Sequence, residues 1–178
     1  GGGSGLVNAG MNPPNGVVFN YYIKNANDST RLSIMIMDRN KKMIKTFSTS
    51  AREGAGGGAG GGRAGGAVTE KIEVEKGMNQ FEWDMNYSEA ERVEGLILWN
   101  GFIGGPKAAP GNYFAKFKSG SDSSEVPFTI VGDPNYKTSQ AEYDEQFNFL
   151  ITLRDKSSEI MKAIKNIRDV RQQMSDFS

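Results

Sequence analysis

The chain has 178 residues, 37% of them hydrophobic and 23 of them glycine, which suits one ordinary domain with a modest core. Lysine plus arginine (21) balances aspartate plus glutamate (21), so no overall charge attracts nucleic acid or an anionic membrane. The sequence contains neither cysteine nor histidine, which excludes disulfides, a thiol nucleophile, cysteine or imidazole metal sites and a Ser-His-Asp triad.

Residues 1–16 begin with GGGSG and continue with further glycine, asparagine and proline, so we expect a flexible linker before the first strand. This start is neither a charged nor an apolar signal segment, and we interpret the chain as a piece of a longer protein. No apolar run approaches the roughly 20 residues that a membrane helix needs. We therefore expect no membrane insertion.

Short stretches with alternating apolar and polar residues, bounded by turn residues, dominate residues 17–134. They predict strands at residues 17–23, 32–37, 43–47, 68–74, 78–85, 112–118 and 126–131. Residues 38–41 predict a hairpin turn, and Pro110-Gly111 predicts a type II turn. Strand, polar turn and strand at this spacing favour an antiparallel immunoglobulin-like or fibronectin-III-like β-sandwich.

Residues 54–67 interrupt these strands with the glycine-rich run GAGGGAGGGRAGG. Such a run has almost no side chain to bury and a large backbone entropy to lose, so we expect a disordered loop. A phosphate-binding loop is the alternative. It requires a lysine with serine or threonine and then a helix, whereas a strand pattern follows here.

The period of the apolar residues changes at residue 139. Ser139 and Glu142 have the spacing of a capping box, and neither glycine nor proline interrupts residues 139–178. We expect one helix about 55 Å long, with a helical hairpin as the alternative. With Ser157 filling the gap between Leu153 and Ile160, its apolar positions recur about every 3.5 residues, which is typical of a coiled-coil seam. These positions are Tyr143, Phe147, Leu150, Leu153, Ile160, Ile164, Ile167, Val170 and Met174.

Three groups of side chains could hold a cation or perform acid–base chemistry: Asp38 with Asn40, Glu82 with Asp84, and Glu142 with Asp144 and Glu145. The first group fits a solvated hairpin turn, because no further oxygen ligands follow at calcium-loop spacing. The second lies on the polar face of a strand, with no third catalytic group. The third suits a helix start, where carboxylates complement the dipole. We therefore expect no catalytic residue, no metal site and no cofactor.

Two aromatic residues lie in an irregular, glycine-containing segment between the predicted strands. Trp99 and Phe102 could stack on a sugar or anchor a partner, as aromatic residues on loops often do. We favour the interpretation that they close one end of the sandwich. A glycan therefore remains the alternative ligand of this segment, and a carbohydrate-binding module the alternative function.

The predicted helix is longer than a small sandwich is wide, so part of its seam requires another partner. Ile160, Ile164 and Ile167 are the candidate contact residues for that partner. The helix also carries a basic strip of Lys162, Lys165, Arg168 and Arg171. Acidic residues interrupt the strip and no aromatic platform accompanies it, so we expect a solvated face and not a nucleic-acid site.

Four segments together resemble a known family: GMNQFEWDM, GPKAAPGNYFAKFKSG, VPFTIVGDPN and SQAEYDEQFNFLITLRDKSSEIMKAIKNIRDVRQQ. In this order they resemble the C-terminal region of bacterial sortilin-type (Vps10-like) propeller proteins, common in Bacteroidetes and often labelled BNR-repeat glycosyl hydrolases. The sandwich half also resembles the FlgD-type immunoglobulin-like domain. Its D-x-x-G turn and PG-x-Y strand correspond to residues 38–41 and 110–113, with Asn40 or Lys41 where glycine is usual.

The resemblance implies a non-catalytic accessory or scaffolding domain, because the propeller that would hold a hydrolytic site has no counterpart here. It implies a bacterial parent that is exported to the periplasm, the cell surface or the medium. The implied partner is the parent's own N-terminal propeller, or another protein chain that the helix contacts. The motifs that match are structural, so no functional residue follows from them.

Overall fold

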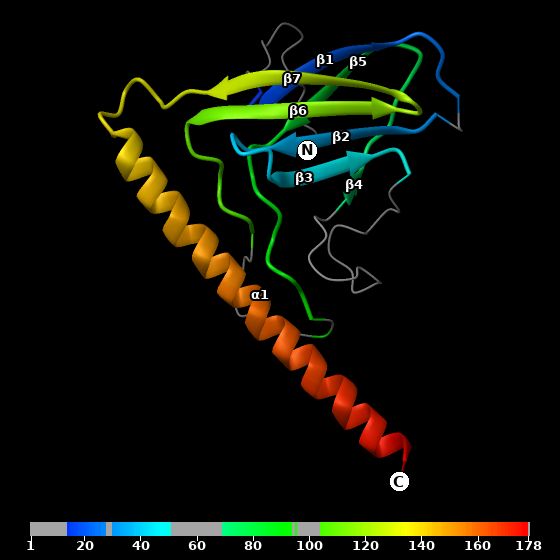
Figure 1. Ribbon diagram of the computed structural model, residues 1–178, viewed down its shortest axis with the longest axis vertical. Helices are drawn as coiled ribbons and strands as arrows, with labels where there is room; N and C mark the ends of the chain where they lie inside the picture. Colours follow the sequence, from blue (N-terminus) through cyan, green and yellow to red (C-terminus); the bar gives the residue numbers. More distant parts are fainter. Residues whose placement is uncertain (1–13, 28–29, 51–68, 94, 96–103, 178) are drawn as a thin grey trace, which may run out of the picture.

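The computed structural model describes residues 14–27, 30–50, 69–93, 95 and 104–177. Two β-sheets pack face to face at one end, and a single long helix leads away from them (Figure 1). The strands are β1 (Val17–Ile23), β2 (Leu32–Met37), β3 (Met43–Ser48), β4 (Thr69–Lys71), β5 (Gly77–Trp83), β6 (Gly111–Ser119) and β7 (Asp122–Ile130), and the helix is α1 (Gln140–Asp176). The prediction of a mainly β chain with a C-terminal helix is confirmed.

The two sheets differ in size. One consists of β1 and β5, and the other has the strand order β4-β3-β2-β6-β7. Every pair is antiparallel except β3 with β4, which is parallel. The expectation of a wholly antiparallel sandwich is therefore wrong at this edge, and the strand expected over residues 68–74 is only three residues long.

Alternating apolar side chains from both sheets form the core between them. Along β2, Leu32, Ile34 and Ile36 are buried while the residues between them are not. Aromatic rings complete the core, with Phe19 of β1 edge-on to Phe128 of β7 across the two sheets at 5.3 Å. Period-two alternation with β-branched and aromatic residues thus produces the buried faces that the sequence predicts.

The turn between β2 and β3 is held by one carboxylate. Asp38 accepts hydrogen bonds from the backbone N–H groups of Asn40 and Lys42, and the Lys41 N–H donates to the Asp38 carbonyl. Lys41 has φ of 61°, a left-handed conformation that favours glycine. Its ammonium group compensates by pairing with Glu125 and lying over the Phe114 ring. Asp38 therefore serves the hairpin, as predicted.

The entry to β6 is fixed by a tyrosine hydroxyl. Tyr113 is 6% exposed, and its hydroxyl donates a 2.7 Å hydrogen bond to the carbonyl of Ala109, four residues upstream. Gly111, the first residue of β6, has φ of 152°, far from the about 80° of a type II turn. The type II turn predicted at Pro110-Gly111 is therefore wrong, and the tyrosine holds this corner.

Helix α1 is continuous, and no break divides Gln140–Asp176 into a hairpin. The capping box that starts it is confirmed. The Ser139 hydroxyl accepts from the Glu142 N–H at 3.3 Å, and the Glu142 carboxylate accepts from the Ser139 N–H at 2.7 Å. These two bonds satisfy backbone donors that a helix start leaves unpaired.

Candidate interaction surface

An extended segment without strand or helix, residues 86–93, lies between the sandwich and α1, and we call it the arm. It leaves the sandwich directly after β5, where the Trp83 indole N–H donates to the Asn86 carbonyl at 3.1 Å. The Ser88 hydroxyl donates to the Ile44 carbonyl of β3, and Ala90 is 4% exposed. Hydrogen bonds to two strands of the sandwich thus order the start of the arm.

One face of α1 packs on the arm, and we call it the inner face. The ring of Phe147 lies 4.8 Å from that of Tyr87. About two turns farther on, the Arg154 guanidinium donates a 2.7 Å hydrogen bond to the Ser88 carbonyl. These contacts combine apolar burial with a charge-assisted hydrogen bond, which fixes the angle between helix and arm.

The inner face continues toward the middle of the helix. The Ser158 hydroxyl accepts from the Glu91 N–H at 3.1 Å, and the Lys162 ammonium lies 3.5 Å from the Glu91 carboxylate. Between them Met161 is 8% exposed, the most buried residue of the helix. The arm therefore supports the first two thirds of α1 along its length.

A second face of α1, next to the inner face, is apolar and mostly exposed. Leu153, Ile160, Ile167 and Met174 recur at intervals of seven residues, with exposed fractions of 55%, 59%, 68% and 69%. Leu150 and Ile164, three residues before two of them, complete the heptad positions, and we call these six residues the seam. A seven-residue apolar repeat is the pattern of a helix that pairs with another helix. In the monomer it faces solvent instead.

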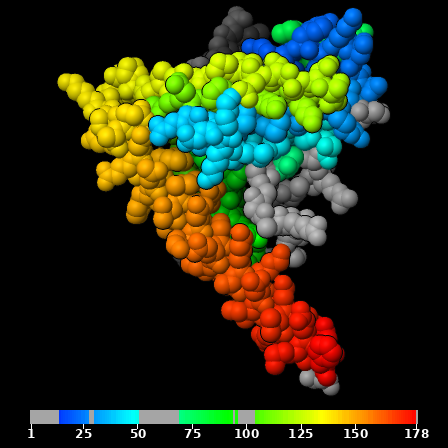
Figure 2. Space-filling view, viewed as in Figure 1, coloured from blue at the N-terminus to red at the C-terminus, as the bar shows by residue number. Residues whose placement is uncertain are grey.

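The C-terminal part of the seam lies far from the sandwich. All side chains from residue 165 to residue 177 are exposed. In the space-filling view this part of α1, coloured orange to red, extends beyond the rest of the molecule (Figure 2). A surface presented at this distance is accessible to another protein without steric interference from the two sheets.

The structure describes some of the predicted contact residues but not others. Ile160 and Ile167 lie on the seam and are exposed, and Ile164 is half-buried at its border. Trp99 and Phe102 lie outside the described residues, as does the glycine-rich run 54–67. The interpretation of Trp99 and Phe102, as a closing plug or as a sugar platform, therefore remains a prediction.

The inner face was missed in the sequence. It consists of Phe147, Ile151, Arg154, Ser158 and Met161, which follow one another at intervals of four and three residues. Such intervals define one helical face. Two of its members, Ser158 and the charged Arg154, are polar, so hydropathy alone obscured the inner face. The sequence did not reveal the contacts of Ser88 and Glu91 with the helix. Ser88 binds Arg154 through its backbone carbonyl, and Glu91 binds Ser158 through its backbone N–H, and side-chain patterns do not predict such contacts.

Several of the carboxylates considered as catalytic or metal ligands have structural partners, as Asp38 does in the hairpin. Asp84 accepts hydrogen bonds from the backbone and side-chain N–H groups of Asn86, so it shapes the start of the arm. The bond from the Ser139 N–H lowers the pKa of the Glu142 carboxyl. Among the described residues, no group of three or more histidine, cysteine, aspartate or glutamate side chains could hold a metal.

Two phenols, the buried Tyr113 and the half-buried Tyr87, lie where the arm meets the sandwich. Burial raises the pKa of Tyr87 above its usual value, and the neighbouring Tyr113 and the charge of Asp38 raise it further. Burial also raises the pKa of Tyr113, with added contributions from Asp38 and Asp144. The folded protein therefore favours the neutral form of both phenols.

We expect the fold to lose stability in alkaline solution for this reason. A phenol with a raised pKa in the folded state keeps its proton longer than in the unfolded chain, where it ionises near pH 10. Its contribution is complete below about pH 10 and is lost as the pH rises above that value. Urea unfolding between pH 8 and pH 11 measures this loss, and Tyr87→Phe should reduce its slope. An unchanged slope in Tyr87→Phe would contradict the role of this phenol.

Comparison with known proteins finds no match to this chain among protein-family models, curated proteins or solved structures. A search of the described residues also finds no helix long and apolar enough to cross a membrane.

Proposed function

We propose that this chain is a non-catalytic accessory domain that presents a rigid helix to another protein surface. The observation that carries the proposal is the division of α1 into two faces. Its inner face is anchored by the arm, whereas the seam leaves apolar side chains such as Ile160 and Ile167 more than half exposed. Exposed apolar surface of this extent commonly marks an interaction site. A helix with i, i+3 and i+7 anchors matches recognition between helices.

We also propose that the sandwich is immunoglobulin-like, as in the FlgD-type domain. The bond from the Tyr113 hydroxyl to the carbonyl of Ala109 supports this, because such a tyrosine corner is a hallmark of immunoglobulin-like sandwiches. The Asp38 turn also corresponds to the D-x-x-G turn of that domain. By this reading the sandwich is a scaffold, and its role is to hold the arm and the helix.

The resemblance to the C-terminal region of sortilin-type propeller proteins supports a wider proposal. In this wider proposal the domain belongs to a larger exported bacterial protein. The seam then contacts either the propeller of that protein or another chain. The carboxylates support a non-catalytic role, since Asp38, Asp84 and Glu142 all serve turns or the helix cap.

Site-specific photo-cross-linking tests the interaction role. A benzoylphenylalanine at Ile167 lies on the seam, whereas one at Asn166 lies on the same exposed turn but off the seam. In cells that produce the full-length protein, we expect a discrete cross-linked protein product from position 167 and much less from position 166. Equal yields, or no product from position 167, would overturn the proposal.

Two further results would replace this function with another. Binding to a polysaccharide that is lost in Trp99→Ala would favour the carbohydrate-binding module. Hydrolysis of a glycoside that is lost in Glu82→Gln would make the chain an enzyme.

A further inference from the structure

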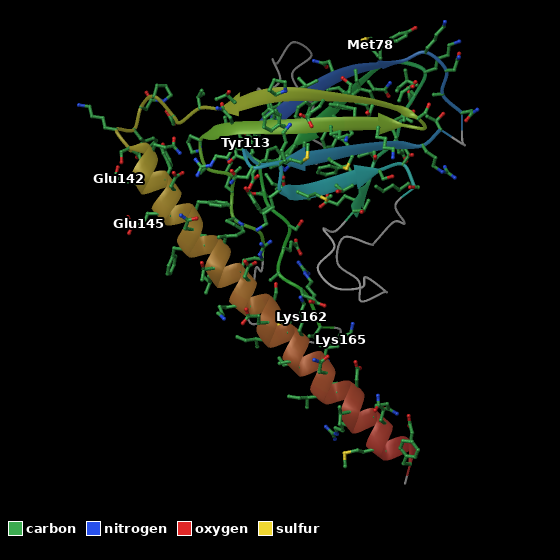
Figure 3. All side chains as sticks on the ribbon, in the orientation of Figure 1. Met78, Tyr113, Glu142, Glu145, Lys162 and Lys165 are labelled. Carbon is green, nitrogen blue, oxygen red and sulfur yellow. The ribbon has the colours of Figure 1, made fainter. Side chains whose placement is uncertain are left out.

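The seam has a charge distribution that distinguishes its two ends. Glu142 and Glu145 lie near the start of α1, and Lys162 and Lys165 lie past its middle (Figure 3). Closer to the seam, Arg168 and Arg171 follow in the basic half. Helical spacing places Glu142 and Arg171 near the line of the seam and Glu145 and Arg168 on its flanks. The helix is thus acidic just before the first seam residue, Leu150, and basic near the end of the seam.

We propose that the seam pairs with the seam of a second copy of this chain, in an antiparallel coiled coil. This inference rests on the proposed function and names its partner. Antiparallel pairing brings the acidic end of each helix beside the basic end of the other. A purely acidic partner helix would suit Arg171 but would be repelled at Glu142 and Glu145, so the second copy is the partner that complements both ends.

The apolar positions support the same arrangement. Antiparallel layers join residues whose numbers have a constant sum, and one register matches apolar to apolar throughout most of the seam. In that register Leu150 lies opposite Ile167 of the second copy, Leu153 opposite Ile164, Ser157 opposite Ile160, and Gln146 opposite Arg171. The two strongly polar positions of this register, Gln146 and Arg171, therefore face each other. They lie at the end of the helix pair, close to Glu142 and Glu145.

Parallel pairing is disfavoured by the same residues. In register it would place Arg171 against Arg171 of the second copy and Glu142 against Glu142. Like charges that face each other across a helix pair are destabilising. The arm leaves Leu153, Ile160 and Ile167 more than half exposed, so these seam residues remain accessible to a second helix.

Sedimentation equilibrium of the chain at concentrations up to about 100 µM tests the association by mass action. We expect a monomer–dimer equilibrium that Ile160→Glu and Ile167→Glu shift toward monomer by roughly tenfold or more in the dissociation constant. Both side chains are more than half exposed, so the fold should persist, and circular dichroism verifies it. Asn166→Glu is the matched control, since it adds the same charge beside the seam and should leave the equilibrium unchanged.

The absence of cysteine makes the orientation testable. One chain carrying Leu150→Cys is mixed with a differently tagged chain carrying Ile167→Cys and treated with a short bis-maleimide reagent. Antiparallel pairing predicts the mixed product and little self-linked Leu150→Cys, whereas parallel pairing predicts the reverse and would overturn the proposal.

A chain that stays monomeric at all these concentrations would also overturn the second copy as partner. The proposed function would then still stand if position 167 cross-links to a different protein in cells. The proposed function would fall only if the cross-linking yields at position 167 and position 166 were equal. Failure of the dimer and failure of the proposed function therefore give different results.

Discussion

Replacement of Trp83 by alanine should lower the free energy of unfolding by about 3–5 kcal/mol, the cost of deleting a large aromatic side chain from a packed core. Trp83 is 0% exposed, and its ring lies edge-on to Tyr113 and Phe128 of the facing sheet at 6.1 Å each. It also donates to the Asn86 carbonyl at the start of the arm. The substitution therefore damages the core and the attachment of the arm together.

Urea denaturation followed by circular dichroism measures this loss. A domain of this size is commonly stable by only about 5–15 kcal/mol, so Trp83→Ala should leave it close to unfolding at room temperature. Met78→Ala is the control, because Met78 lies on the same strand β5 but is 71% exposed (Figure 3). A similar loss in the two variants would contradict the assignment of Trp83 to the core.

Replacement of Phe147 by alanine should detach the first half of α1 from the arm. The Phe147 ring packs at 4.8 Å on Tyr87, which itself packs against the core. Loss of this half-buried contact should cost roughly 2 kcal/mol of helix–arm packing. Because isolated helices are marginal in water, the helix should then fray more readily.

Phe149→Ala provides a control of the same chemistry two residues away. Phe149 is 68% exposed and points away from the arm, so its replacement should change stability by less than about 0.5 kcal/mol. Hydrogen exchange of the backbone amides in residues 143–162 measures the difference at a dilute protein concentration. Equal exchange rates in the two variants would show that the arm does not hold the helix.

Most of the fold could be predicted because its strands carry local signals. The alternation along β2, the Asp38 turn and the Ser139–Glu142 capping box each arise from neighbouring residues, and the structure confirms all three. The burial of Trp83 also follows from its place between charged residues on a strand. Such features depend on side-chain period and on turn chemistry.

The remaining features depend on contacts between residues far apart in the sequence. The short parallel pairing of β4 with β3 joins residues 46–48 with residues 69–71, which no local pattern reveals. At Pro110-Gly111 the hydrogen bond from the Tyr113 hydroxyl to the Ala109 carbonyl fixes the backbone, and the type II turn that this dipeptide favours does not form. The arm lacks regular structure, so only its tertiary partners give it form.

The candidate surface was half predicted. One apolar repeat was recognised along the helix, but the structure divides it between two partners. Tyr143 and Phe147 belong to the side that faces the sandwich and the arm, whereas Leu153 and Ile167 belong to the exposed side. A period near 3.5 residues describes both faces, since the inner face also follows intervals of four and three residues. Arg154 and Ser158 interrupt the hydropathy of the inner face, so only the exposed face gives a clear apolar repeat.

The arm contacts α1 only as far as Lys162, and this has a mechanical consequence. From Lys162 to Met174, α1 extends for about 18 Å beyond its last contact with the arm. A tilt of about 10° at that last contact would displace the tip by about 3 Å on this geometry. Small changes in packing at the sandwich are therefore amplified into larger displacements at the far end of the helix, where Met174 lies.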